Sequence, residues 1–146
     1  MGLYIHVPFC GSICSYCHFS RTADHQPVVR LRYVNAVLKE FELRRRVCPT
    51  LQSGRLLETA YVGGGTPTEL EPELMTRLLA GTVGRLKPAD SFEFTCEANP
   101  ESFDEVKAQG LIDAGVNRIS LGVQSLDQRV LKLLGRACGP ETARRA

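Results

Sequence analysis

The sequence predicts an α/β fold in which parallel strands alternate with helices, as in part of a (β/α) barrel. Four strand patterns, each followed by a helix pattern, succeed one another along the chain. Such βα repeats give parallel strands with right-handed crossovers. The strands also carry polar residues at alternate positions, which indicates that one face lines a polar barrel interior. An open doubly wound sheet, the alternative, would bury apolar residues on both faces.

The first unit combines a strand at 2–7 with a helix at 28–47. The strand alternates apolar residues with Tyr4 and His6 at a period of two, which is typical of a strand with two different faces. The helix carries an apolar stripe with a period of three to four residues. The residues of this stripe are Leu31, Val34, Leu38 and Phe41.

The second unit has a short strand at 58–62 and a helix that begins at Pro72, because proline is favoured at the first helical position. A glycine run, Gly63-Gly64-Gly65-Thr66-Pro67, lies between them. The apolar stripe of this helix consists of Leu74, Met75, Leu78 and Leu79.

The third unit begins with a strand at 91–97, which Asn99-Pro100 ends. We expect Ser102 to cap the helix that follows, which carries Phe103 and Val106.

The fourth unit has a strand at 117–124 and a helix that begins after Asp127 and ends before Gly135. The polar residues nearest the C-terminal ends of the third and fourth strands are Glu97 and Gln124. Barrel enzymes build their active sites at this end of the strands, so both residues are candidates for a site.

The chain has 146 residues, of which 43% are hydrophobic, and this is enough for one core. A complete eight-stranded barrel takes about 250 residues. We therefore expect residues 1–146 to be the N-terminal portion of a barrel domain, with the rest of the barrel and a C-terminal domain lying outside the sequence.

The formal net charge is only +2, and no basic tract interleaves with aromatic residues, so no nucleic-acid partner is expected. Arg44, Arg45 and Arg46 are expected to close a helix, where cations favour the negative end of its dipole. No apolar run approaches the roughly 18 residues that cross a bilayer, so we expect no membrane span and a cytoplasmic location. The six cysteines are too sparse and too clustered for a disulfide scaffold, which favours metal-binding or redox roles.

Cys10, Cys14 and Cys17 form a C-x3-C-x2-C pattern in the loop after the first strand. Three thiolates can hold three irons of a [4Fe-4S] cluster and leave the fourth iron open to another ligand. Zinc with a nearby histidine as the fourth ligand fits the spacing equally well. A redox pair of Cys14 and Cys17 is a third interpretation, although it leaves Cys10 unexplained. The spacing alone does not separate these alternatives.

The cysteine loop, the glycine run and Glu97 at the end of the third strand together resemble the radical S-adenosylmethionine (SAM) superfamily. Four segments, at 4–10, 61–68, 97–101 and 120–125, resemble its HemN/HemW group. That group contains oxygen-independent coproporphyrinogen III dehydrogenase and heme chaperones. The resemblance runs through almost the whole chain and implies a radical SAM partial (β/α) barrel, of which four βα units are present.

The resemblance also implies cofactors. Cys10, Cys14 and Cys17 would ligate a [4Fe-4S] cluster whose open iron binds SAM, and an electron from the cluster would cleave SAM to a 5′-deoxyadenosyl radical. The cofactor then supplies the difficult chemistry, and the protein supplies placement. The residues that the resemblance places around the cluster and SAM are Tyr4, Tyr16, Gly64, Gly65, Thr66, Glu97, Gln124 and Arg136.

Each of these residues also has a structural interpretation. The glycine run could form a tight turn or a phosphate cradle, and Glu97 could be a solvated acid beside the turn. Arg136 could be a cation at a helix end, and the two tyrosines could pack half-buried. His6 is expected to be a structural residue, because a lone inward histidine is more often satisfied than catalytic.

One position separates the branches of the group. The dehydrogenase usually carries a further cysteine two positions after the third ligand, whereas this chain has Phe19. The resemblance therefore implies a heme chaperone, with heme as cargo, acceptor hemoproteins as partners and an electron donor for the cluster. Oxidative decarboxylation of coproporphyrinogen III to protoporphyrinogen IX is the alternative, and a structural zinc domain is a third. No catalytic residue is identified, and His18, where an acid is frequent in the chaperone branch, has no assigned role.

Overall fold

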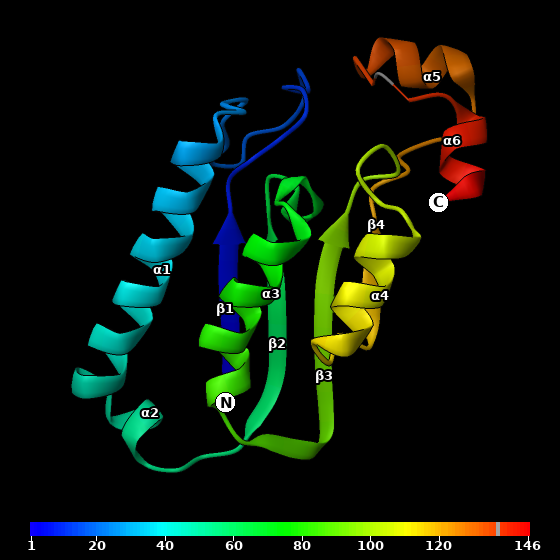
Figure 1. The fold of residues 1–146 in the computed structure, drawn as a ribbon. Coiled ribbons are helices and arrows are strands. Elements are labelled where there is room, and N and C mark those ends of the chain that lie inside the picture. The colour runs from blue at the N-terminus through cyan, green and yellow to red at the C-terminus, as the bar shows by residue number, and fades with distance from the viewer. Residues whose placement is uncertain (137) are drawn as a thin grey trace.

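The computed structural model describes residues 1–136 and 138–146. Four parallel strands form one sheet in the order β1-β2-β3-β4 (Figure 1). The strands are β1 (Gly2–Val7), β2 (Leu57–Gly64), β3 (Pro88–Ala98) and β4 (Arg118–Leu121). The predicted α/β class with parallel strands is confirmed. The sheet is open, with β1 and β4 at its edges, as in a partial barrel.

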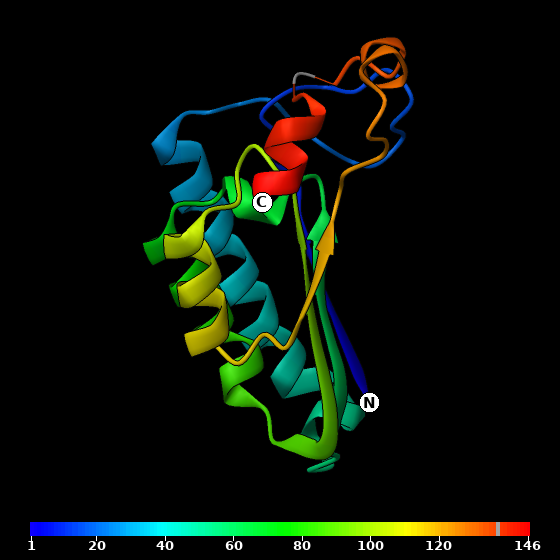
Figure 2. The same cartoon turned by 90° about the vertical axis from the view of Figure 1, so that its right-hand side faces the viewer.

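The three longer helices cover one face of the sheet (Figure 2). They are α1 (Pro27–Val47), α3 (Pro72–Gly81) and α4 (Glu105–Asp113). Two further helices, α5 (Gln128–Leu133) and α6 (Pro140–Arg145), lie beyond the C-terminal ends of the strands (Figure 1). The remaining short elements are α2 (Pro49–Gln52), η1 (Pro67–Glu69) and η2 (Val83–Arg85).

The hydrophobic core lies between the three longer helices and the sheet. Its side chains are apolar and almost completely buried: Ile5, Val7, Val34, Val62, Leu78, Leu79 and Phe94. The alternate strand residues point to the opposite face, where Tyr4 pairs in register with Tyr61, and Tyr61 with Thr95. The prediction of strands with one apolar and one polar face is therefore confirmed, because successive side chains of a strand point to opposite sides.

Helix α4, the helix of the third predicted unit, begins later than the sequence predicts. Asp104, not Ser102, is its N-cap, and the Asp104 carboxylate accepts a hydrogen bond of 2.9 Å from the Lys107 backbone N–H. The Ser102 hydroxyl instead lies 2.6 Å from the hydroxyl of Thr68. Within α4 (Glu105–Asp113), Leu111 is buried, whereas Val106 is 69% exposed. Val106 lies in this helix as expected, whereas Phe103, which was also expected in it, precedes the helix.

Two smaller expectations also differ from the structure. Leu31 of the predicted α1 stripe is 41% exposed, whereas Val34 and Phe41 are buried. The fourth strand ends at Leu121 rather than at 124: Val123 N–H donates to Leu121 O at 2.9 Å in a local turn, and the backbone of Gln124, with a φ of 61°, is not extended. The helix after Asp127 begins as predicted, with the Asp127 carboxylate accepting a hydrogen bond from Arg129 N–H at 2.7 Å.

Three arginines occupy the last turn of α1, as predicted: Arg44, Arg45 and Arg46. The Arg44 guanidinium also pairs with Glu40 one turn earlier, at 2.7 Å. Among the residues that the structure describes, no helix is both long and apolar enough to cross a membrane.

We expect Phe94→Ala to lower the free energy of unfolding by about 3–5 kcal/mol, because it leaves a cavity in a well-packed core. Phe94 is completely buried on β3. The exposed Val106→Ala should change the same free energy by less than about 0.5 kcal/mol. Urea unfolding of both variants measures the difference, and equal midpoints would contradict the assignment of Phe94 to the core.

Candidate functional site

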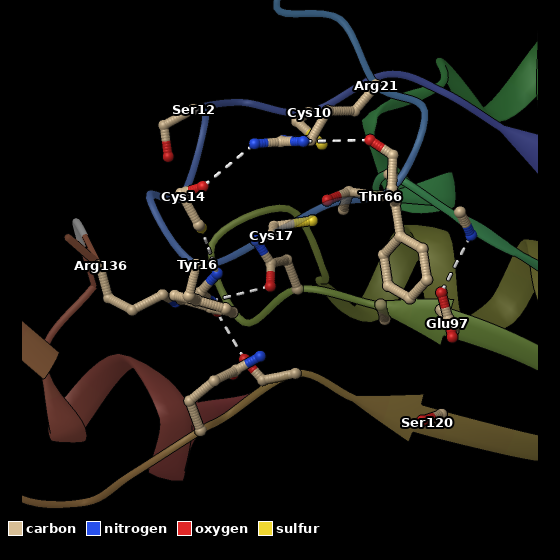
Figure 3. Close-up of a pocket in the computed structure, with 17 residues that line it drawn as sticks. Cys10, Ser12, Cys14, Tyr16, Cys17, Arg21, Thr66, Glu97, Ser120 and Arg136 are labelled. Atoms are coloured by element: carbon tan, nitrogen blue, oxygen red, sulfur yellow. Dashed lines mark hydrogen bonds between the residues drawn. The ribbon is translucent and has the colours of Figure 1, made fainter. Parts of the chain in front are cut away.

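A pocket lies at the C-terminal ends of the strands, between the cysteine loop, the glycine run and the segment after β4 (Figure 3). It gathers residues that are far apart in the sequence, because parallel strands end at the same edge of the sheet. All the predicted site residues except Tyr4 line it: Cys10, Cys14, Tyr16, Cys17, Gly64, Gly65, Thr66, Glu97, Gln124 and Arg136.

The cysteine loop is closed at its base by backbone hydrogen bonds. Phe9 and Thr22 form an isolated parallel bridge, with Cys10 N–H donating to Thr22 O at 2.9 Å and Thr22 N–H to Pro8 O at 2.8 Å. Within the loop, Cys17 N–H donates to Cys14 O at 3.2 Å. These bonds hold three cysteines in twelve residues of otherwise irregular chain.

The three thiols differ in burial. Cys10 is buried at the base of the loop, and Cys14 and Cys17 are half-buried at the pocket wall. Burial raises the pKa of the Cys10 thiol, and a hydrogen bond with the Thr66 side chain opposes this effect. Ligation of a metal by Cys10 therefore has to overcome the cost of forming a buried thiolate.

The three thiols lie close enough for Cys14 and Cys17 to act electrostatically on Cys10. In the described ranges, no three Cys, His, Asp or Glu side chains are grouped as ligands of a single metal ion. A structural zinc site needs four donors converging on one ion. In a cubane cluster each thiolate binds a different iron, so the chemistry of three cysteine donors in one loop fits a [4Fe-4S] cluster with one open iron.

The glycine run approaches the base of the cysteine loop closely. Gly65 N–H donates to Val7 O at 2.8 Å, and Thr66 N–H donates to Phe9 O at 2.6 Å. A Cβ atom at position 65 would lie 2.7 Å from the carbonyl oxygens of Pro8 and Phe9, so only glycine fits there. The run thus forms a floor next to the thiols without filling the pocket with side chains.

His6 connects β1 to the end of the cysteine loop. Its Nε2 lies 2.7 Å from Ser20 O, and its Nδ1 lies 2.9 Å from the Tyr4 hydroxyl. Because a carbonyl only accepts, Nε2 carries the proton, and in the neutral ring Nδ1 accepts from Tyr4. A Cβ at Gly64, whose φ is 119°, would lie 2.6 Å from the His6 ring. The expected structural role of His6 agrees with these contacts.

Tyr4 lies outside the pocket wall. Its ring is 56% exposed on the open face of the sheet, and its hydroxyl binds His6. A contact between Tyr4 and a cofactor stays a prediction from the resemblance.

Glu97 is held in place by two donors. Its Oε1 accepts a hydrogen bond of 2.7 Å from the Tyr61 hydroxyl. Its Oε2 accepts one of 3.1 Å from Gly64 N–H (Figure 3). The bond to Glu97 also raises the pKa of Tyr61 above its ordinary value. Glu97 is therefore a fixed acceptor at the pocket wall rather than a solvated acid beside the turn.

Arg136 reaches the pocket from the segment after α5. Its Nη2 donates to Asn99 Oδ1 at 2.8 Å and to Gly122 O at 3.0 Å, and its Nη1 lies 3.8 Å from Cys14 Sγ. Within the described part of the chain, its buried Nε has no partner. Arg136 thus binds across the pocket rather than acting only as a helix-end cation, and one donor is left over.

Two further predicted residues lie on this side of the pocket. Gln124 is the only described residue other than glycine with a positive φ, 61°, a conformation that concentrates at functional sites. Tyr16 is 41% exposed, and burial, together with a hydrogen bond to Cys14, raises the pKa of its hydroxyl.

The sequence analysis missed several residues of this site. Three of them, Tyr61, Asn99 and Gly122, lie within the motifs at 61–68, 97–101 and 120–125. The motifs could therefore have identified these residues as site candidates. Arg21, which crosses the cysteine loop, carried no such signal. The other missed lining residues are Ser12, Ala98 and Ser120.

Comparison with known proteins gives the family. The model of the radical SAM superfamily matches residues 4–146. The heme chaperone HemW of Escherichia coli (strain K12) is 41% identical over 149 residues, which cover 100% of this chain and 38% of that protein. The oxygen-independent coproporphyrinogen III oxidase of Paracoccus denitrificans (strain Pd 1222) is 38% identical over 150 residues, which cover 100% of this chain and 32% of that protein.

A solved structure resembles the fold closely. The coproporphyrinogen III oxidase HemN of Escherichia coli, described as a radical SAM enzyme, superimposes with a TM-score of 0.86 at 28% identity. The match covers 97% of this chain and 32% of that structure. The chain therefore spans about a third of the length of the relatives it matches, and its superfamily in general uses a [4Fe-4S] cluster and SAM. The chain belongs to the radical SAM superfamily and, within it, to the HemW/HemN group.

Proposed function

We propose that this chain is the cluster- and SAM-binding part of a HemW-like heme chaperone, which holds heme and passes it to acceptor hemoproteins. The observation that carries this proposal is Phe19. It lines the pocket, 63% exposed, two positions after Cys17, where the dehydrogenase branch usually has a further cysteine. A phenyl ring supplies neither a thiol nor a proton there.

The residues present fit both cofactors of the superfamily. Cys10, Cys14 and Cys17 would hold the [4Fe-4S] cluster, and the open iron would bind SAM beside the floor made by Gly64 and Gly65. When bound, the two groups supply one-electron chemistry that can abstract a hydrogen atom.

The polar residues of the pocket wall would orient SAM. Glu97, fixed by Tyr61 and by Gly64 N–H, would accept hydrogen bonds from the SAM amino group. Arg136 would direct its unpartnered Nε donor towards an anionic group of the ligand, and Gln124 would add an amide. Charge-assisted bonds of this kind are stronger than neutral ones.

In this proposal residues 1–146 are the N-terminal portion of the radical SAM core domain. We assign the heme contacts to a part of the protein other than this pocket. A low-potential electron donor reduces the cluster, and the protein is cytoplasmic. In the chaperone the cluster and SAM serve assembly or control rather than turnover of a porphyrinogen.

The second candidate function is oxidative decarboxylation of coproporphyrinogen III to protoporphyrinogen IX. It is favoured by the 38% identity to the Paracoccus denitrificans oxidase and by the fold of HemN. Phe19 counts against it, for the reason given above.

The two functions are separated by an assay on the full-length protein, loaded with iron and sulfide under anaerobic conditions. With reductant, SAM and coproporphyrinogen III, we expect no protoporphyrinogen, whereas added heme should bind and then appear in an apo-hemoprotein. A dehydrogenase of the same group serves as the positive control. Protoporphyrinogen formed by this protein would contradict the chaperone proposal.

We expect Cys14→Ala to abolish the broad visible absorption of the cluster, because only two thiolates remain in the loop. The measurement is the absorption spectrum, with iron and sulfide content, after anaerobic reconstitution. Cys48→Ala is the matched control, since Cys48 lies between α1 and α2 and outside the pocket. An unchanged Cys14→Ala spectrum would refute the ligand assignment.

Gly65→Ala should weaken SAM binding by about tenfold or more, or about 1.4 kcal/mol, because its Cβ would push the floor away from Pro8 and Phe9. Equilibrium dialysis of labelled SAM against the iron-loaded protein measures the affinity. Gly110→Ala is the control, because a Cβ there meets nothing within 4 Å. Equal affinities of the two variants would show that the close approach at Gly65 does not shape the SAM site.

A further inference from the structure

Arg21 crosses the cysteine loop from its C-terminal end. Its Nη1 donates to Phe19 O at 3.0 Å, and its Nη2 donates to Cys14 O at 3.2 Å. Figure 3 shows the guanidinium between these two acceptors, with Cys10 beside it. The Cys14 carbonyl also accepts from Cys17 N–H, so the ligand-bearing part of the loop is tied both to itself and to Arg21.

The charge of Arg21 is not balanced by a neighbouring acid. Its two hydrogen bonds go to neutral carbonyls, and among the described residues it forms no ion pair. Its Nε is buried and, in that same part of the chain, has no partner. A guanidinium stays charged in proteins, and a partly buried charge is costly unless an opposite charge compensates it.

The opposite charge would come from the occupied loop. The negative charge of three thiolates exceeds the positive charge of an oxidised cubane core, so the cluster with its ligands is anionic. Reduction by one electron increases this negative charge. A cation held inside the loop stabilises the reduced form more than the oxidised form. Nearby charges and hydrogen bonds are among the features that set the potential of an iron–sulfur cluster.

We propose that Arg21 is a positioning residue of the cysteine loop and that its guanidinium favours one-electron reduction of the cluster held there. This inference rests on the proposed ligation by Cys10, Cys14 and Cys17. In the step concerned, one electron enters from a low-potential one-electron donor; no bond breaks and no proton moves. Arg21 contributes a fixed positive charge, and its planar fork, unlike a lysine ammonium, reaches two carbonyls at once.

The test compares the Arg21→Gln and Arg21→Lys variants with the wild type as full-length proteins reconstituted under anaerobic conditions. Iron and sulfide content shows whether the loop is loaded, and a redox titration followed by the absorption or EPR signal of the cluster gives the potential. For Arg21→Gln we expect a loaded cluster whose equilibrium constant for reduction is about tenfold lower, which corresponds to a potential about 59 mV more negative. Arg21→Lys keeps the charge and should stay within about twofold of the wild type.

Arg129→Gln is the matched control for the loss of one positive charge. The Arg129 side chain is 90% exposed on α5 and pairs with Asp127, so solvent screens it, and the potential should not change.

The outcomes distinguish this inference from the function proposed above. If the Arg21→Gln protein holds a cluster that has the wild-type potential, the proposed role of Arg21 is overturned, and the ligand assignment stands. If Arg21→Gln takes up no cluster, Arg21→Lys decides: a near wild-type potential supports the role of the charge, and a tenfold shift overturns it. Wild-type protein without iron and sulfide would overturn the ligand assignment itself, and this inference with it.

Discussion

The close backbone approach between the glycine run and the end of β1 is the constraint on which the site depends. Gly65 and Thr66 donate to the carbonyls of Val7 and Phe9, at 2.8 and 2.6 Å, and this leaves no room for a Cβ at position 65. The contact fixes the base of the cysteine loop against the second βα unit. The Thr66 side chain also forms a hydrogen bond with the buried Cys10. The same contact between segments therefore positions both the glycine run and the cysteine loop.

The sequence predicts the sheet well because its signals are local. A strand with one buried face shows a period of two, and the four strands and their polar faces follow from it. Helix phase is less local. The start of α4 depends on a hydroxyl pair between Ser102 and Thr68, from the preceding unit, and on Asp104 as the cap. The sequence pattern therefore predicts Ser102 as the cap and Phe103 within the helix, whereas the helix begins only after Asp104.

The candidate site divides along the same line. Cysteines, glycines and Glu97 can be predicted because they follow strand ends in recognisable motifs, and parallel topology brings those ends together. Arg21 cannot be predicted in this way, because it donates to two backbone carbonyls. Every residue has a backbone carbonyl, so the sequence does not show which ones act as acceptors. Asn99 differs from Arg21 because it lies in the motif at 97–101, but its hydrogen bond of 2.8 Å with Arg136, 37 positions away, forms only on folding.

The backbone at Gln124 has a consequence for the whole pocket. A residue with a side chain in the left-handed conformation costs about 1–2 kcal/mol, whereas glycine would adopt it freely. Placing the Gln124 side-chain amide here therefore lowers the stability of the folded chain, and the packing around the residue must compensate for this free-energy cost. The wall at 120–125 is held by Gly122 N–H, which donates to Ala98 O at 2.8 Å, and by Arg136, which donates to Gly122 O at 3.0 Å. A wall fixed in this way costs a ligand less ordering entropy than a loose segment would.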